Sequence, residues 1–324
     1  MSDATGEAND EGRGFKKFRP PEHSSREHRR RRLRRHGRRA YVRSVYFLPS
    51  LATLGNAICG FGSMYVASLD EADASKSVDA LTHFFAMHNF LVAAYLIFFA
   101  MVFDALDGRL ARYTRHTTDF GGQLDSLADV VSFGAAPAFL ALQLFKFEHQ
   151  GDLLPMFSRL VWAIGALYMS CAAMRLARFN VSNEHGEQAH FSFLGLPSPG
   201  AGGAVAGWVL LQQELRHDPW HGHLQSTAGF LASFCTWLLP VLVLITGLLM
   251  ISNIRYGHMV NRYLRGKRSF GRLILVVAIL LLIITAHRYV VALCSVGYAL
   301  AGLGSYAYTR LRRRQLPLPA KVNF

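Results

Sequence analysis

The stretch DALDGRLARYTRHTTDFGGQLDSLAD, residues 104–129, decides the predicted fold, because it sets four aspartates at the junction of two apolar segments. Charged groups inside membrane helices are costly and by default mark function. Asp104 and Asp107 are spaced i,i+3, and Asp125 and Asp129 are spaced i,i+4. Each pair therefore shares one face of its helix. The turn between the pairs folds the second helix back on the first, so we expect the two acidic faces to meet.

Residues with almost no side chain share these acidic faces. Gly108 and Ala111 follow Asp104 at i+4 and i+7, and Gly121 lies one turn before Asp125. Residues at such spacings line one stripe of a helix. We therefore expect a bulky group to lie directly against this backbone, beside the acids.

Four carboxylates in a small volume repel one another, so they either keep protons or bind cations. Ligand sets made of oxygen alone favour the hard ions Mg²⁺, Mn²⁺ and Ca²⁺. Two such ions could bridge a diphosphate and stabilise both its attacking and its leaving oxygens. Arg109, Arg112 and Arg115 add positive charge nearby. This combination favours a phosphate-bearing substrate over two alternatives, a structural ion network and a cation transport path.

The composition predicts a multi-pass membrane protein. Hydrophobic residues make up 51% of the 324 residues and charged ones 17%, and the apolar residues gather in long runs. A bilayer core needs about 20 mostly apolar residues per helix. The predicted fold class is all-α, a polytopic membrane bundle of about eight transmembrane helices. Their predicted spans are 47–69, 87–111, 121–145, 157–179, 196–214, 227–251, 271–287 and 288–307.

Basic residues predict the orientation of this bundle. Cytoplasmic loops of membrane proteins carry an excess of Lys and Arg. With the arginine-rich N-terminal stretch inside, the basic clusters at 109–115, 175–178, 255–272 and 310–314 all fall on the same side. We therefore expect the aspartates at the cytosolic mouth of the bundle.

The net charge of +14 is concentrated at the N-terminal end, where residues 26–43 read REHRRRRLRRHGRRAYVR. Such a run indicates binding to anionic lipid or to nucleic acid. It directly precedes the first apolar segment and has no aromatic side chains within its core, so we favour a lipid-facing tail and expect no nucleic-acid partner. The predicted domains are a disordered basic cytosolic tail (1–44), a transmembrane domain (45–310) and a cytosolic C-terminal tail (311–324).

The aspartate stretch resembles the signature of the CDP-alcohol phosphatidyltransferases, D-x2-D-G-x2-A-R-x8-G-x3-D-x3-D. Its fixed positions are all filled, by Asp104, Asp107, Gly108, Ala111, Arg112, Gly121, Asp125 and Asp129. The resemblance implies a six-helix core that usually forms a homodimer, here with two additional C-terminal helices. It also implies a bacterial cytoplasmic (inner) membrane as the location.

The resemblance further implies the chemistry of the site. The first three acids of the signature would bind Mg²⁺ or Mn²⁺, two ions in all, and Asp129 would be the general base and could also touch metal. Gly108, Ala111, Arg112 and Gly121 would bind the CDP-linked lipid. Asn56, a polar residue within the first apolar span, could contact the nucleotide or instead form an interhelical hydrogen bond.

Further stretches resemble membrane-embedded phosphatidylserine synthases of bacteria and archaea. They are FLPSLATLGNAICGFGS (47–63), SFGAAP (132–137), RLARFN (175–180), GLPSP (195–199) and SNIRY (252–256). The implied reaction transfers the phosphatidyl group of CDP-diacylglycerol to L-serine, with release of CMP.

The carboxylate of serine calls for a cation in the pocket, and Arg suits carboxylates. Arg175 and Arg178 are the candidates, either as serine ligands or as anchors for lipid headgroups, with Asn180 beside them and Ser198 and Asn253 as weaker candidates. The alternatives keep the chemistry with another acceptor, glycerol 3-phosphate or an inositol phosphate, or replace it by cation transport or by a non-catalytic lipid-binding scaffold.

Overall fold

The computed structural model describes residues 51–70, 79–114, 119–149, 155–184, 195–217, 225–254 and 286–315. All of them belong to one unit, Leu48–Phe324, and every regular element within them is a helix. The predicted all-α polytopic bundle is confirmed. The basic N-terminal tail and residues 271–285 of the seventh predicted span lie outside the described residues.

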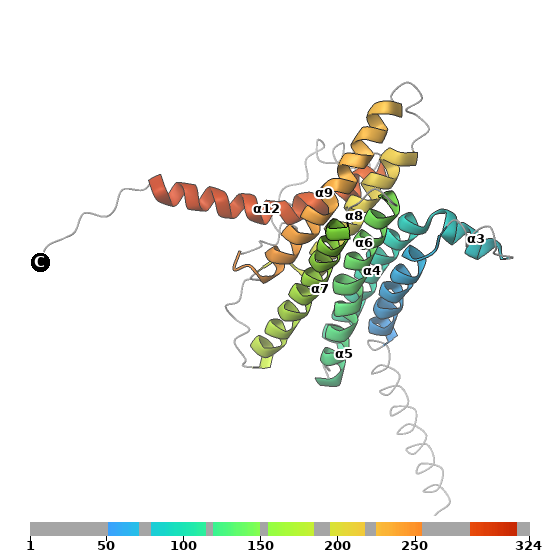
Figure 1. Cartoon of the computed structure of the whole chain (residues 1–324). Helices are drawn as coiled ribbons and strands as arrows, with labels where there is room; N and C mark the ends of the chain where they lie inside the picture. Colours follow the sequence, from blue (N-terminus) through green and yellow to red (C-terminus); the bar gives the residue numbers. More distant parts are fainter. Residues whose placement is uncertain are drawn as a thin grey trace, which may run out of the picture. The chain divides into compact units, whose positions relative to one another are not determined.

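The helices succeed one another along the chain with short connections (Figure 1). The first described helix is Leu51–Ala67, and it is followed by α3 (Ala80–Met87), α4 (Asn89–Thr114) and α5 (Asp119–Asp129). The π-helical turn η1 (Val130–Ala135) then leads into α6 (Ala136–Glu148). The remaining helices are α7 (Pro155–Glu184), α8 (Ser198–His217), α9 (Gln225–Ile251) and α12 (His287–Gln315).

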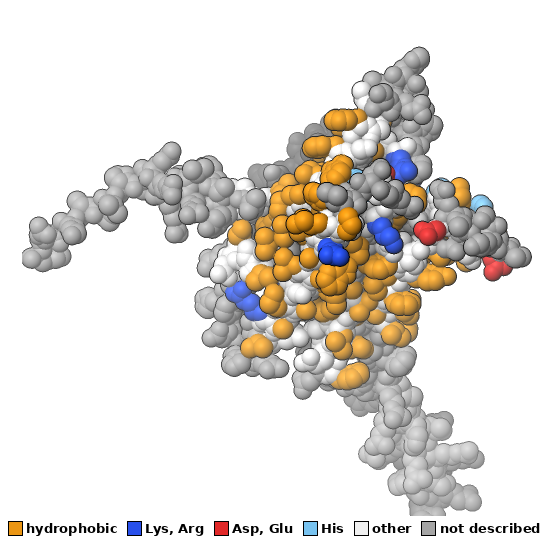
Figure 2. All heavy atoms as spheres, in the orientation of Figure 1, with side chains coloured by type: hydrophobic (Ala, Val, Ile, Leu, Met, Phe, Trp, Pro, Cys, Tyr) orange, Lys and Arg blue, Asp and Glu red, His pale blue; other side chains and the backbone are white. Residues whose placement is uncertain are grey.

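Within the described residues, four helical segments are long and apolar enough to cross a membrane. They are Asn89–Leu110, Phe120–Glu148, Pro155–Val181 and Thr227–Ile251, and Leu51–Ala67 is a shorter apolar helix. Hydrophobic side chains cover most of the described surface on the face that Figure 2 shows. Apolar patches of this extent mark a surface that meets lipid or another protein. The chain is therefore a multi-pass membrane protein.

Helix α8 is the buried element of the bundle, in contact with α4, α6, α9 and α12. Almost every residue from Ala201 to Leu210 is buried. Small residues allow this close packing, as they do in membrane helices generally. A Cβ atom on Gly202 would lie 3.3 Å from the Phe133 ring, and one on Gly207 would lie 3.2 Å from the Cα atom of Ala292. Since its neighbours shield it from lipid, α8 does not need a strongly apolar sequence.

Helix α12 packs along α8 and is held at its N-terminal end by two polar contacts. Arg288 forms an ion pair with Glu214 of α8, and His287 is hydrogen-bonded to the Tyr95 hydroxyl of α4 at 2.7 Å. Ala292 and Ala299 of α12 are fully buried, at 1% and 0% exposure. The predicted C-terminal helix is therefore an integral part of the helix bundle.

Two local features differ from the expected map. The third predicted span is not one α-helix, because η1 interrupts it directly after Asp129. The short helix α3 lies in the segment that we expected to be a loop between the first two spans. Neither changes the order of the spans, but the π-helical turn lies next to the candidate site.

Candidate active site

Three of the four predicted acids come together at the ends of α4 and α5. One carboxylate oxygen from each of Asp104, Asp107 and Asp125 lies within 4.8 Å of the others. Asp107 is buried, and its Oδ2 atom accepts a 3.0 Å hydrogen bond from the Thr53 hydroxyl. The sequence expectation that the two acidic faces meet is confirmed for these three residues.

The acids fit a divalent cation. The Oδ1 atom of Asp125 is buried and has no hydrogen-bond partner among the described residues. A buried carboxylate oxygen without a partner carries a desolvation cost that a bound cation removes. Three carboxylates within reach of one another form a ligand set of oxygens alone, which favours Mg²⁺ or Mn²⁺ over softer metals.

Asp129 lies one turn beyond this group and has a different partner. Its Oδ1 atom accepts a 3.0 Å hydrogen bond from the Nδ2 atom of Asn56, whose side chain is fully buried in the helix Leu51–Ala67. Of the two expected roles of Asn56, the interhelical hydrogen bond is therefore present, and its contact with a nucleotide stays a prediction. The structure separates three clustered carboxylates from a fourth that an amide orients.

The backbone beside the acids is open. A Cβ atom placed on Gly108 would meet no heavy atom within 4 Å in the part of the chain that the structure describes. Gly121 is half-buried on the facing helix. Helix α4 also includes Ala111 and Arg112, but their side chains lie outside the described set. The open face at Gly108 agrees with the expectation that a bulky group lies against this stripe.

The two arginines of α7 have different surroundings, although their i,i+3 spacing puts them on one face. Arg175 is half-buried, and its Nη1 atom donates a 2.6 Å hydrogen bond to the Ser198 hydroxyl of α8. Its Nε atom is buried and has no hydrogen-bond partner among the described residues, and its guanidinium interacts electrostatically with Asp129. Arg175 therefore presents an incompletely paired cation close to the fourth aspartate.

Arg178 instead is exposed and donates from both terminal nitrogens to the Asn253 side-chain oxygen, at 3.3 Å. Asn180 bonds Ser126, the neighbour of Asp125, with an Nδ2–Oγ distance of 2.9 Å. Both residues thus contact segments near the acids, but through partners on the protein itself. Of the three predicted serine ligands, Arg175 is the one placed to meet a bound anion.

The stretch that begins at Gly195 ties these segments together. Gly195 has a positive φ of 85°, a conformation that favours glycine, and its amide donates to the Ile254 carbonyl at 2.8 Å. The next amide, that of Leu196, donates to the Leu249 carbonyl at 3.0 Å. Stretches 132–137, 175–180, 195–199 and 252–256, which look unrelated along the sequence, therefore gather around one end of the bundle.

Two participants were missed by the sequence analysis. Thr53 bonds Asp107, and its position three residues before Asn56 in an apolar helix was a usable signal. Tyr298 of α12 interacts electrostatically with Arg175, and its ring lies 2.9 Å from where a Cβ atom of Gly200 would be. No sequence pattern linked Tyr298 to the site, because α12 reaches it only through packing on α8.

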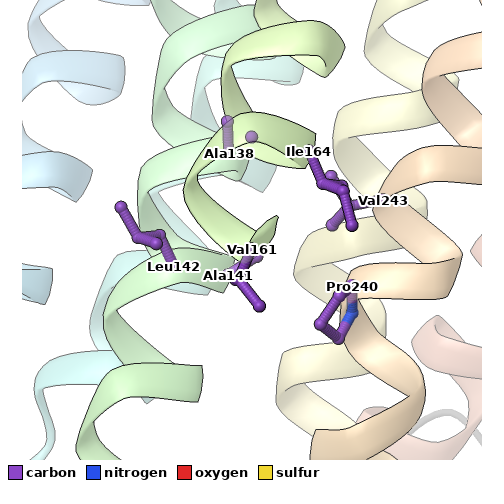
Figure 3. A pocket seen from close by; sticks show the side chains of 8 residues that line it. Ala138, Ala141, Leu142, Val161, Ile164, Pro240 and Val243 are labelled. Carbon is purple, nitrogen blue, oxygen red and sulfur yellow. The ribbon is translucent and has the colours of Figure 1, made fainter. Parts of the chain in front are cut away.

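A small apolar hollow between α6, α7 and α9 is a separate feature (Figure 3). It is lined only by apolar residues, among them Ile164, Pro240 and Val243. Without a charged or polar lining group it cannot hold a diphosphate or a metal ion. The acidic cluster is therefore the candidate active site.

A helix bundle that gathers carboxylates of two consecutive membrane helices at one end defines a membrane-embedded, metal-type enzyme site. The family model described as CDP-alcohol phosphatidyltransferase matches residues 46–245, and the chain belongs to this family. It is accordingly an enzyme, a transferase of phospholipid biosynthesis. The match ends within α9, so α12 lies beyond it.

Three relatives carry the name CDP-diacylglycerol–serine O-phosphatidyltransferase. The one from Helicobacter pylori is 31% identical over 217 residues, which is 67% of this chain and 74% of the relative. The one from Methanocaldococcus jannaschii is 33% identical over 212 residues, 65% of this chain and 82% of the relative. The one from Bacillus subtilis is 32% identical over 157 residues, 48% of this chain and 71% of the relative.

Proposed function

We propose that this protein transfers the phosphatidyl group of CDP-diacylglycerol to the hydroxyl of L-serine, giving phosphatidylserine and CMP. The names of its relatives support both substrates. The observation that carries the proposal is the half-buried Arg175 guanidinium, incompletely paired and in electrostatic contact with Asp129. Serine needs a cation for its carboxylate close to the group that activates its hydroxyl, and Arg suits a carboxylate.

The donor would bind at the open face of α4 and α5. In this proposal Asp104, Asp107 and Asp125 hold two Mg²⁺ or Mn²⁺ ions, with Asp129 as a further ligand. Such ions supply Lewis-acid stabilisation of a diphosphate and of the oxygens that attack and leave. The CDP-lipid lies against the open backbone, with Gly108, Ala111, Arg112, Gly121 and Asn56 as its contacts.

Asp129 acts on the acceptor. Its carboxylate takes the proton of the serine hydroxyl while the serine oxygen forms a bond to the lipid-side phosphorus of the donor. The bond between that phosphorus and the oxygen of CMP breaks, and CMP leaves with the electron pair. The hydrogen bond from Asn56 fixes the direction of the Asp129 carboxylate, so the remaining oxygen can face the acceptor.

The proposed setting is the bacterial cytoplasmic membrane, with the site at its cytosolic face and a homodimer as the assembly. The basic clusters of the sequence support this orientation through the positive-inside rule. Both substrates are available at such a site, since the lipid donor lies in the bilayer and serine is a polar solute.

The acceptor is tested by CMP release from CDP-diacylglycerol by the purified protein in Mn²⁺ or Mg²⁺. Serine is compared with glycerol 3-phosphate and with inositol phosphate at equal concentration. We expect release with serine and only background with the phosphorylated alcohols. Release with another alcohol would keep the aspartate chemistry and remove serine as the acceptor. No release with any alcohol, from folded protein, would favour cation transport or a lipid-binding scaffold.

Replacement of Arg175 by lysine tests the acceptor pocket. A hydrogen bond to a charged group contributes about 1.5–3 kcal/mol, which corresponds to roughly a 10- to 100-fold change in affinity. We expect Arg175→Lys to raise the KM for serine by about this factor and to leave the KM for CDP-diacylglycerol nearly unchanged. Arg159→Lys, at the exposed start of α7, is the matched control. An equal serine KM in the two variants would exclude Arg175 as the serine ligand.

A further inference from the structure

The turn that follows Asp129 is π-helical, and the sequence explains why. The amide of Ala136 donates to the Val131 carbonyl, five residues back, which is the π-helical pattern. An α-helix would require Pro137 to donate to the Phe133 carbonyl, but proline has no N–H and its ring clashes with that carbonyl. The wider turn relieves this conflict. Single π-helical turns inside α-helices often lie at functional sites.

A tyrosine from another helix satisfies the carbonyl that proline cannot serve. The Tyr168 hydroxyl of α7 donates to the Phe133 oxygen at 3.0 Å. Tyr168 and Phe133 are fully buried, at 1% and 0% exposure. In the interior of a membrane protein a backbone carbonyl needs such a partner. Tyr168 therefore holds η1 in its π-helical form.

The same turn brings Ser132 against the first described helix. The Ser132 hydroxyl donates to the backbone oxygen of Asn56 at 2.9 Å, and both residues are fully buried. Gly60 makes this approach possible, since a Cβ atom there would lie 2.6 Å from Ser132 Oγ and 2.7 Å from its Cα. Ser132 thus fixes the backbone of the residue whose side chain bonds Asp129.

These contacts form a closed path around Asp129. The chain runs from Asp129 directly into η1, Ser132 of η1 holds Asn56, and the Asn56 amide returns to the Asp129 carboxylate at 3.0 Å. A carboxylate with one fixed oxygen and a fixed backbone has few orientations left. The two hydroxyl contacts of η1 therefore bear on the direction of Asp129, although neither hydroxyl is bonded to it.

We propose that Ser132 and Tyr168 are positioning residues of the transfer reaction, which hold η1 and Asn56 so that Asp129 is aimed at the acceptor hydroxyl. This inference rests on the proposed function, in which Asp129 is the base. Misplacement of a reacting group by about 1 Å can cost on the order of 100-fold in rate. Loss of either hydroxyl should therefore lower kcat without weakening substrate or metal binding.

The test replaces each hydroxyl and pairs it with a control of the same kind. Ser132→Ala is compared with Ser63→Ala, because Ser63 is equally buried and its hydroxyl donates to the Ala93 carbonyl at 2.8 Å. Tyr168→Phe is compared with Tyr95→Phe, which removes the hydroxyl bonded to His287. Each variant is measured for kcat, for both KM values, for Mn²⁺ affinity by titration calorimetry and for its thermal midpoint.

We expect Ser132→Ala and Tyr168→Phe to lower kcat by about 10- to 100-fold, with KM values and Mn²⁺ affinity within about twofold of the wild type. Because they act on one path, the double variant should lose little more than the worse single one. Equal kcat in Ser132→Ala and Ser63→Ala at equal thermal midpoints would overturn the inference, and so would a loss of Mn²⁺ affinity as large as that of Asp125→Asn. An inactive wild type, or an active Asp129→Asn variant, would instead refute the proposed function.

Discussion

Asp129→Asn should lose nearly all CMP release, a fall of about 10²- to 10⁴-fold in kcat, which is the usual contribution of a positioned general base. The amide has almost the volume of the carboxylate and keeps an oxygen that can accept the hydrogen bond from Asn56. It cannot take the proton of the acceptor. The fold and the donor site should therefore survive, and the measurement is CMP release at saturating serine beside a thermal unfolding curve.

Asp79→Asn is the control for this change. Asp79 precedes α3, outside the cluster, and its side chain makes no capping hydrogen bond there. This variant should release CMP at the wild-type rate. Full turnover by Asp129→Asn, at a wild-type thermal midpoint, would show that Asp129 is not the base.

Removal of divalent metal should abolish activity. The carboxylates of Asp104, Asp107 and Asp125 lie within 4.8 Å of one another, and without a cation their repulsion also works against binding of the donor diphosphate. Excess chelator should reduce CMP release to background, and added Mg²⁺ or Mn²⁺ should restore it. Asp125→Asn should require at least about 10-fold more metal, since even outer-shell changes cost metal sites 10- to 100-fold.

The control for metal removal is the apo protein itself, which should keep its helical circular dichroism and recover activity on repletion. Activity that persists in excess chelator would contradict the metal mechanism. Restoration of Asp125→Asn at the wild-type metal concentration would remove Asp125 from the ligand set.

Much of the fold follows from local signals. Long apolar runs fixed the spans, and the spacing of acids at i,i+3 and i,i+4 fixed which helix faces carry Asp104 and Asp125. The π-helical turn was not predicted, although Pro137 four residues after Phe133 is its cause. Proline at this spacing predicts a disturbed helix, but packing against Gly60 and Tyr168 decides the form that the disturbance takes.

The site was predictable as far as residue spacing reaches. Asp104, Asp107 and Asp125 meet as expected, whereas the sequence left two partners open for Asn56 and gave Arg175 and Arg178 equal standing. Those choices depend on tertiary contacts. Ser198 bonds Arg175 from α8, and Asn253 bonds Arg178 from the end of α9, and no periodicity in one helix can reveal a partner on another.

The most direct measurement is the joint yield of phosphatidylserine and CMP from CDP-diacylglycerol and labelled serine, with purified protein in Mn²⁺. If the aspartate site transfers the phosphatidyl group to serine, the two products form in equal amounts, and both disappear on chelation and in Asp129→Asn. CMP released without labelled lipid, or equal products that persist without metal, would contradict this account.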